Sequence, residues 1–143
     1  MRARQAQFES ELFGPDIPKL RPIIEPNVSD SAAFDNALEF LHIAGRSLPQ
    51  AIMTMMTEAW ETNHTMDANR RAFYHYSGAL MQPWDGPAAI SFTNGRVIGA
   101  ALDRNGLRPA RYSVTRDGRV LVASEDGALP VDASEVVEHD SLG

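Results

Sequence analysis

Apolar side chains follow two different periods along this chain, and the change lies near Pro83. Before Pro83 they recur three and four residues apart, the spacing of one face of an α-helix. After it, short runs rich in β-branched residues are separated by glycine-containing turns, a pattern typical of antiparallel strands. Helices followed by strands predict an α+β fold, with the helices first and an antiparallel β meander after them.

Two of the helices precede residue 60. The first begins near Asp30 and ends at Gly45, because glycine commonly follows the last helical residue. The second covers residues 48–58, with Pro49 in its first turn. The apolar face of the first helix comprises Phe34, Ala37, Leu38, Leu41 and Ala44.

A third helix is predicted over residues 65–81. Either Thr65 or Asp67 can cap its N-terminus, since both side chains accept hydrogen bonds from backbone N–H groups. Its apolar face comprises Ala72, Tyr76 and Leu80.

Four strands are predicted after Pro83. They cover residues 87–92, 96–102, 110–115 and 119–124. The first and third connections contain Asn-Gly and Asp-Gly, which are compact hairpin signals. Residues 97–102 are apolar at both alternating sets of positions, so we expect this sheet to be covered on both faces. Residues 135–140, EVVEHD, are interpreted as a solvated acidic face.

Composition and charge exclude several classes of function. The formal net charge is −6 and the basic residues are scattered, which argues against nucleic acid as the main partner. No apolar run reaches the roughly 20 residues of a membrane helix, and we expect a cytoplasmic protein without a membrane partner. Cysteine is absent, which excludes disulfides and a cysteine nucleophile within these residues. The histidines are isolated, so no metal site is predicted.

Asp30 stands at the start of the first helix and has two interpretations. As an N-cap, its carboxylate would accept backbone N–H bonds and complement the helix dipole. Ser29 or Ser31 can cap equally well, however, and would leave Asp30 to bind the ammonium group of a ligand. The residues alone leave both interpretations open.

The stretch ALDRNGLRPARY is far more polar than the apolar runs on either side of it. Asn105 and Gly106 form a pair able to adopt positive φ, and Pro109 restricts Arg108 to extended backbone. Asp103 can accept hydrogen bonds from the N–H groups of the loop or from the neighbouring arginines. We therefore predict a structural loop ordered by its own polar contacts.

Three stretches resemble the amidotransferase region of glutamate synthase large chains. They are SDSAAFDNALEFLHIAGRSLPQAI, PWDGPAAISFTNGRVIGAALDRNGLRPARY and VLVASEDGAL, in this order. The resemblance covers nearly the whole chain and implies that residues 1–143 are the C-terminal portion of a class II glutamine amidotransferase domain. The fold it implies is part of an N-terminal nucleophile hydrolase αββα sandwich, with two antiparallel sheets between helix layers.

The resemblance also implies a function. The parent protein would make L-glutamate from L-glutamine and 2-oxoglutarate, and this region would help to release the ammonia. FMN and an iron–sulfur cluster are expected elsewhere in the parent, with no cofactor in this fragment. The implied partners are L-glutamine, the remaining domains and a small electron-donating subunit. The alternatives are another class II amidotransferase, such as amidophosphoribosyltransferase, and a non-catalytic truncated module.

One of the family's site residues has a match in this chain. Asp30 lies in the SDS motif whose aspartate holds the ammonium group of glutamine, so the resemblance implies that Asp30 binds substrate. The N-terminal cysteine nucleophile, the arginine for the substrate carboxylate and the oxyanion Asn-Gly pair have no match. MRAR at the start resembles the stretch after that pair, so we expect the first half of the domain to precede Met1. The fragment alone is expected to be inactive, and DRNGLRP is expected to be structural.

Overall fold

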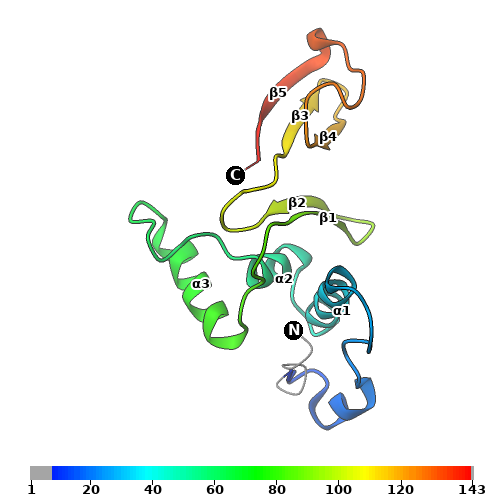
Figure 1. The fold of residues 1–143 in the computed structure, drawn as a ribbon, viewed down its shortest axis with the longest axis vertical. Helices are drawn as coiled ribbons and strands as arrows, with labels where there is room; N and C mark the ends of the chain where they lie inside the picture. The colour runs from blue at the N-terminus through cyan, green and yellow to red at the C-terminus, as the bar shows by residue number, and fades with distance from the viewer. Residues whose placement is uncertain (1–7, 143) are drawn as a thin grey trace. The chain divides into compact units, whose positions relative to one another are not determined.

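A computed structural model describes residues 8–142, and the prediction for MRAR lies outside them. Helices come first and antiparallel strands follow, as predicted (Figure 1). The chain divides into two compact units, Met1–Ile52 and Met53–Gly143, and each is described by itself. The elements are η2 (Gly14–Leu20), α1 (Asp30–Ile43), α2 (Leu48–Met55), α3 (Ala68–Leu80), β1 (Ala89–Thr93), β2 (Ile98–Leu102), β3 (Arg111–Thr115), β4 (Val120–Ala123), η3 (Ala133–Glu135) and β5 (Val136–Ser141).

Both ends of α1 follow from local signals in the sequence. At the N-terminus, the Ser29 hydroxyl accepts a hydrogen bond from the N–H of Ala32 at 3.2 Å. At the C-terminus, Gly45 adopts a φ of +98°, which suits a residue without Cβ. The N–H of Arg46 then donates to the carbonyl of Leu41 at 3.1 Å, satisfying a group that the helix end leaves open. The predicted end of this helix is confirmed.

The buried side of α1 follows the predicted period. Phe40 lies on this side as well, and its ring stacks on Phe8 at a centroid distance of 5.4 Å and meets Phe13 at 6.2 Å. The buried residues of α1 are Ala33, Phe34, Ala37, Leu38, Phe40 and Leu41. Aromatic contacts of this kind add to the stabilisation that burial of apolar area provides.

α2 is shorter than predicted, because it ends at Met55 instead of Glu58. The carbonyl of Met55 accepts a hydrogen bond from the N–H of Trp84 at 2.6 Å, in place of one from a further helical turn. A contact with a residue distant in sequence therefore competes with continuation of the helix, which no local pattern reveals.

α3 begins after Asp67, and this N-cap is one of the two that the sequence offers. The carboxylate of Asp67 accepts hydrogen bonds from the N–H groups of Asn69 at 3.0 Å and Arg70 at 3.1 Å. Thr65 is not the cap, and its hydroxyl donates to the side chain of Asn63. The helix is shorter than the predicted 65–81 because the cap lies after Thr65.

The predicted buried face of α3 is wrong. Tyr74 and Ser77 are the buried residues of this helix. The hydroxyl of Tyr74 donates to Glu58 at 2.7 Å, and the Ser77 hydroxyl lies 3.4 Å from that of Thr54. These polar partners, supplied by the segment before α3, select the inward side of the helix. The side chains predicted to be buried are all exposed: Ala72, Tyr76 and Leu80.

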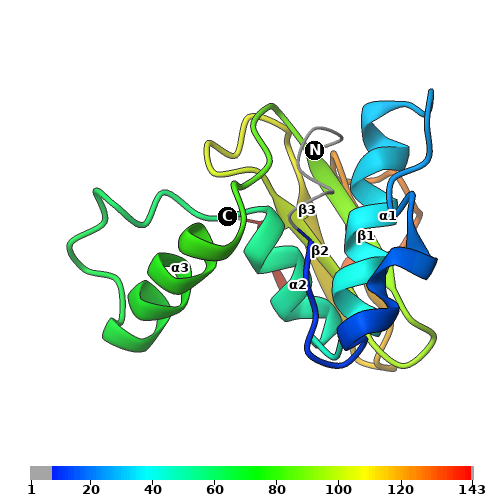
Figure 2. The ribbon, with the colours of Figure 1, turned by 90° about the horizontal axis from the view of Figure 1, so that it is seen from below.

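β1 and β2 form an antiparallel two-stranded sheet and lie side by side (Figure 2). The turn between them is ordered by the Asn94 side chain, which accepts hydrogen bonds from the N–H groups of Arg96 and Val97. Within the sheet, Phe92 stands opposite Gly99. A Cβ built on Gly99 would lie 2.2 Å from the Phe92 ring, so the ring occupies the space that a side chain would need.

The remaining strands form a second antiparallel sheet in the order β4-β3-β5. The hairpin between β3 and β4 is the one that the Asp-Gly signal predicts. Residues 135–140 are predicted to be a solvated acidic face, but most of them belong to the strand β5. The interpretation is right about exposure, since most of β5 is exposed, but the backbone still pairs with β3. A polar strand of this kind is typical of a sheet edge, where charges discourage pairing with other chains.

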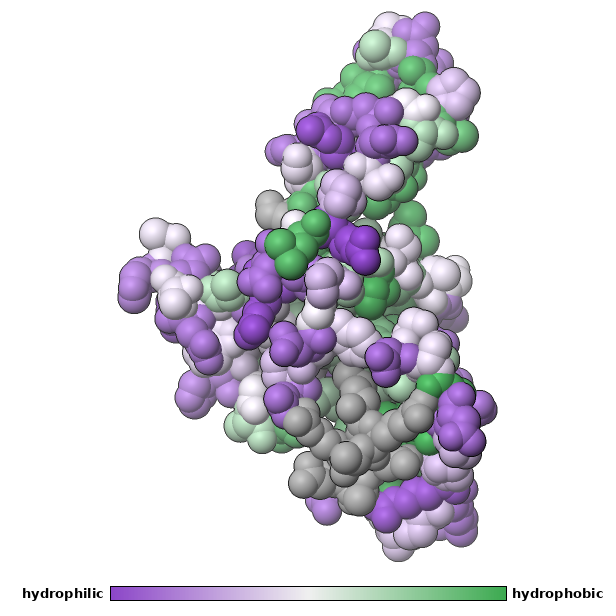
Figure 3. All heavy atoms as spheres, in the orientation of Figure 1, coloured by the Kyte–Doolittle hydropathy of each residue, from purple (hydrophilic) through white to green (hydrophobic). Residues whose placement is uncertain are grey.

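The described strands do not form the single meander that the sequence predicts. β2 pairs with β1 and β3 pairs with β4 and β5, so the connection between β2 and β3 joins two sheets. The expectation that residues 97–102 are covered on both faces is also wrong for the described residues, because Ile98 is 70% exposed. A two-stranded sheet leaves apolar side chains open in this way. Apolar atoms also reach the surface elsewhere in the chain, as Figure 3 shows in green.

The contact between Phe92 and Gly99 predicts opposite effects for two glycine substitutions. Gly99→Ala forces the ring of Phe92 to move and lowers the free energy of unfolding by about 1–3 kcal/mol. Gly78→Ala is the control, because a Cβ on this helical residue meets nothing within 4 Å. It raises the free energy of unfolding by about 0.5–1 kcal/mol. Urea denaturation of both variants measures these changes, and equal effects of the two would contradict the contact.

The bond between Tyr74 and Glu58 predicts a loss of stability in alkali. Burial, together with the hydrogen bond to Glu58, raises the pKa of Tyr74 from 10.0 to about 12. The unfolded chain releases the Tyr74 proton at a lower pH than the folded protein does. The contribution of Tyr74 to the free energy of unfolding is therefore fully present below pH 10 and falls as the pH rises from 10 toward 12. Denaturation across this range measures the slope. Tyr74→Phe should show a shallower slope, and an identical slope would place the titration elsewhere.

Candidate functional site

The N-terminus of α1 holds the residue that the resemblance marks for substrate binding. Ser29 is the N-cap, so the cap does not occupy Asp30. The hydroxyls of Ser29 and Ser31 lie 3.1 Å apart, and both side chains are exposed. The structure thus selects one of the capping alternatives that the sequence leaves open and releases Asp30 from that role.

Asp30 itself is the first residue of α1, and its side chain is exposed. Within residues 8–142, its carboxylate makes no described hydrogen bond or ion pair. The N-terminal end of a helix stabilises a carboxylate in its ionised form. A charged, accessible carboxylate can bind an ammonium group, and the structure leaves Asp30 open to one.

The segment before α1 is fixed to this helix. The N–H of Glu25 donates to the side chain of Asn36 at 3.2 Å, joining the two segments two turns along the helix. Asn27 adopts a φ of +63°, a backbone conformation that asparagine tolerates better than most residues. The approach to Ser29 and Asp30 is therefore determined by specific contacts of the first unit.

The loop after β2 depends on Asp103, which is 9% exposed. One carboxylate oxygen accepts a hydrogen bond from the N–H of Ala88 at 2.9 Å, and the other accepts one from Asn105 at 3.0 Å. The N–H of Asp103 donates back to the carbonyl of Ala88 at 3.0 Å. The bond from Ala88, with those from Asn105 and Leu107, lowers the pKa of Asp103. Asp103 therefore closes the open end of the β1–β2 hairpin.

The other loop residues act as predicted in part. Gly106 adopts a φ of +57° and donates to the carbonyl of Asp103 at 2.9 Å, while Asn105 does not adopt positive φ. Arg104 pairs with Asp85 at 3.4 Å instead of with Asp103. Arg108 and Pro109 are exposed, and they lead into β3. No described contact connects this loop with catalysis, and its role as a structural element remains a prediction.

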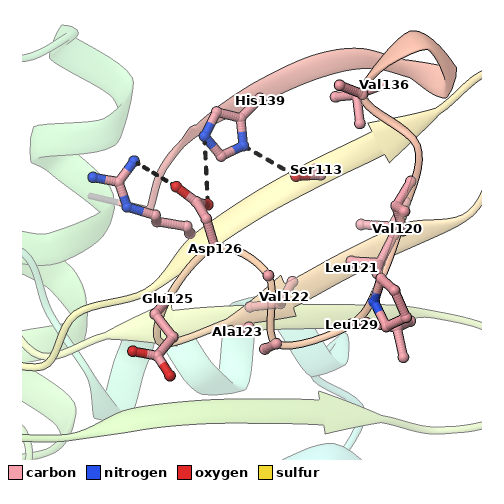
Figure 4. Close-up of a pocket in the computed structure, with 16 residues that line it drawn as sticks. Ser113, Val120, Leu121, Val122, Ala123, Glu125, Asp126, Leu129, Val136 and His139 are labelled. Carbon is pink, nitrogen blue, oxygen red and sulfur yellow. Dashed lines mark hydrogen bonds and ion pairs between the residues drawn. The ribbon is translucent and has the colours of Figure 1, made fainter.

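Sequence reasoning missed a group of polar residues on the second sheet. Ser113 and Arg111 on β3, His139 on β5 and Asp126 in the segment after β4 come together beside a hollow (Figure 4). These residues are isolated in the sequence: the register of β3 with β5 brings His139 beside Ser113, and the segment after β4 adds Asp126. If residues 136–141 had been predicted as a strand next to β3, the pairing of Ser113 with His139 could have been predicted as well.

Among residues 8–142, no group of three or more acidic or histidine side chains could hold a metal ion. No described helix combines the length and the apolar character needed to cross a membrane.

Comparison with known proteins now identifies the family. Residues 1–143 match the family model described as "Glutamine amidotransferases class-II". The chain belongs to this family. It is similar to glutamate synthases: 50% identical over 142 residues to the NADPH-type large chain of Bacillus subtilis and 50% identical over 143 residues to the NADH-type enzyme of Saccharomyces cerevisiae. The ferredoxin-dependent enzyme of Pyropia yezoensis is 43% identical over 145 residues.

The matches cover nearly all of this chain but little of each relative. They include 99% of the chain and 9% of the Bacillus protein, 99% and 7% for the Saccharomyces protein, and 100% and 9% for the Pyropia protein. The resemblance read from the three sequence stretches is confirmed. The chain spans less than a tenth of the length of these glutamate synthases.

The hydrogen bonds of Asp103 predict its effect on stability. Asp103→Asn removes the charge and replaces one accepting oxygen by an NH₂ group, which cannot accept a hydrogen bond from a backbone N–H. The substitution should lower the free energy of unfolding by about 2 kcal/mol. Asp85→Asn is the matched control, because Asp85 makes one exposed ion pair at 3.4 Å, and it should change stability by less than about 0.5 kcal/mol.

The pH dependence of the Asp103 effect follows from its lowered pKa. The charged carboxylate stabilises the fold fully when the pH is above 3.8, the ordinary pKa of an aspartate. This stabilisation is lost as the pH falls through the lower pKa that Asp103 has in the folded protein. Denaturation at pH 7 and at pH 3 measures the difference between the original chain and Asp103→Asn. A difference that stays constant at the two pH values would contradict a charge-based role.

Proposed function

We propose that this chain is part of the glutaminase portion of a glutamate synthase and that Asp30 binds the ammonium group of L-glutamine. The identity of 38–50% with glutamate synthases over the whole chain supports the first part. The second rests on one observation: Ser29 caps α1, which leaves the carboxylate of Asp30 exposed and available. An ammonium group is its natural ligand by charge.

The chemistry divides between this chain and residues outside it. Hydrolysis of glutamine in this family, as the resemblance implies, uses an N-terminal cysteine whose own amine is the base. The 143 residues contain no cysteine, so none of them is this nucleophile, and the contribution that we propose for this chain is binding and positioning. A carboxylate that holds the substrate's ammonium group orients the side-chain amide toward a nucleophile elsewhere, and such positioning lowers the barrier to reaction.

The cofactors of the parent enzyme do not fit this chain. Iron–sulfur clusters are held by cysteine thiolates, and these residues include none. We assign FMN and the cluster to other parts of the parent, together with the site that uses 2-oxoglutarate. The electron-donating small subunit and the cytoplasmic location belong to the same proposal.

The proposed role of Asp30 predicts a selective kinetic defect. In a glutamate synthase that contains this segment, Asp30→Asn keeps the shape of the side chain and removes its charge. A charge-assisted hydrogen bond is worth roughly 1.5–3 kcal/mol, so kcat/KM for glutamine should fall about 10- to 150-fold. Glutamate formation from free ammonia should change little, because it does not require this site. Steady-state rates with the two nitrogen donors measure the effect.

Two control variants separate binding from a structural role. Asp35→Asn removes another exposed carboxylate of α1 and should leave glutamine kinetics unchanged. Ser29→Ala removes the cap, so it should cost about 1 kcal/mol of stability. If Asp30→Asn instead lowered both activities equally, or only lowered the melting temperature, Asp30 would not be a substrate ligand.

A further inference from the structure

A hollow of about 850 Å³ is lined by residues of the β4-β3-β5 sheet and of the segment that connects β4 with β5, and Figure 4 shows these residues. Its volume falls in the range of sites for small molecules. Leu121 on β4, Leu129 in the connecting segment and Val136 at the start of β5 contribute apolar surface to it. The hollow therefore offers room and an apolar wall to a small ligand.

Hydrogen-bond donors gather on the same face of the sheet. Arg111 and Ser113 are two residues apart on β3, so their side chains emerge on one face. His139 stands opposite Ser113 in the register of β3 with β5, and the Ser113 hydroxyl lies 3.0 Å from its Nδ1. When the Ser113 hydroxyl donates to Nδ1, the Nε2–H of His139 and the Arg111 guanidinium remain as donors for a carboxylate, and Ser113 holds the imidazole in this tautomer.

The structure contains a carboxylate at these donors. The oxygens of Asp126 lie 3.5 Å from Nε2 of His139 and 3.6 Å from the Arg111 guanidinium. Both distances are long for charge-assisted hydrogen bonds, and the Asp126 side chain is 59% exposed. The next residue, Gly127, has a φ of +81°, so a glycine turn carries this carboxylate. Asp126 is thus bound weakly and can be displaced.

We propose that Arg111 and His139 bind the carboxylate of a small aliphatic acid, with Ser113 positioning the imidazole of His139. The acid's apolar tail lies in the hollow, and its carboxylate replaces that of Asp126, which acts as an internal competitor. Glu125 points away from His139 and leaves the position open (Figure 4). A monoanion suits the site better than a phosphate, because the charge of Arg111 balances one negative charge. This site is independent of the function proposed for Asp30.

The test is a titration of the 143-residue protein with isocaproate, followed by two-dimensional NMR. The amide signals of Ser113 and His139 should shift with a saturating dependence on isocaproate. Isocaproamide has the same tail without the charge and should leave them unchanged. Equal shifts with the acid and the amide would show binding by the apolar surface alone and would overturn the proposal, as would no shift with either.

Four variants assign the shifts to the proposed donors. Asp126→Asn removes the competitor, and since exposed ion pairs are worth about 0.2–1 kcal/mol, isocaproate should bind about 1.4- to fivefold more tightly. Arg111→Gln should weaken binding about tenfold or more. Arg111→Lys keeps the charge and should retain part of the affinity. Arg116→Gln removes an exposed arginine that does not line the hollow and should bind as the original does.

The variants also provide the results that would refute the site. Unchanged affinity in Arg111→Gln would exclude Arg111 as the carboxylate ligand. Weaker binding in Asp126→Asn would mean that Asp126 supports the ligand instead of competing with it. Dispersed NMR spectra of each variant establish that the fold is retained. The gain of affinity expected for Asp126→Asn cannot result from unfolding.

Discussion

The carboxylate of Asp103 is the constraint on which the second unit depends. It accepts hydrogen bonds from Ala88, which precedes β1, and from Asn105 in its own loop, so one side chain holds two segments 15 residues apart. The bonds between Asp103 and Ala88 extend the β1–β2 pairing by one position beyond Ala89 and Leu102 before the chain turns away. Gly106, at a φ of +57°, completes the turn, and the chain continues into a different sheet.

Local signals made much of this fold predictable. The cap and glycine that bound α1, the Asp67 cap of α3 and the two hairpin turns all act within a few residues, and the structure has each of them. The errors came from distant contacts. Trp84 bonds to Met55 where α2 was expected to continue, and Glu58 and Thr54 draw Tyr74 and Ser77 inward on α3. Residues 136–141 form the strand β5 because their backbone pairs with that of β3.

The candidate site was predictable only through the family motif. Sequence spacing leaves Asp30 either a cap or a ligand; the geometry of the Ser29 hydroxyl shows that Ser29 is the cap, and substrate binding by Asp30 stays a prediction. The nucleophile and the oxyanion groups that the resemblance implies have no counterpart in these residues. Ser113, Asp126 and His139 were missed for another reason: isolated polar residues gain meaning only when strand register brings them together.

Two carboxylates at the ends of regular elements thus have different roles in this account. Asp30 is exposed at a helix end whose cap is another residue, whereas Asp103 is buried and committed to backbone N–H groups. The most direct test of the structural role is an NMR titration of the Asp103 side-chain carboxyl carbon. The pKa of Asp103 should lie below the ordinary value of 3.8, because the N–H groups of Ala88, Asn105 and Leu107 stabilise the charge. A pKa at or above that value would contradict the structural role.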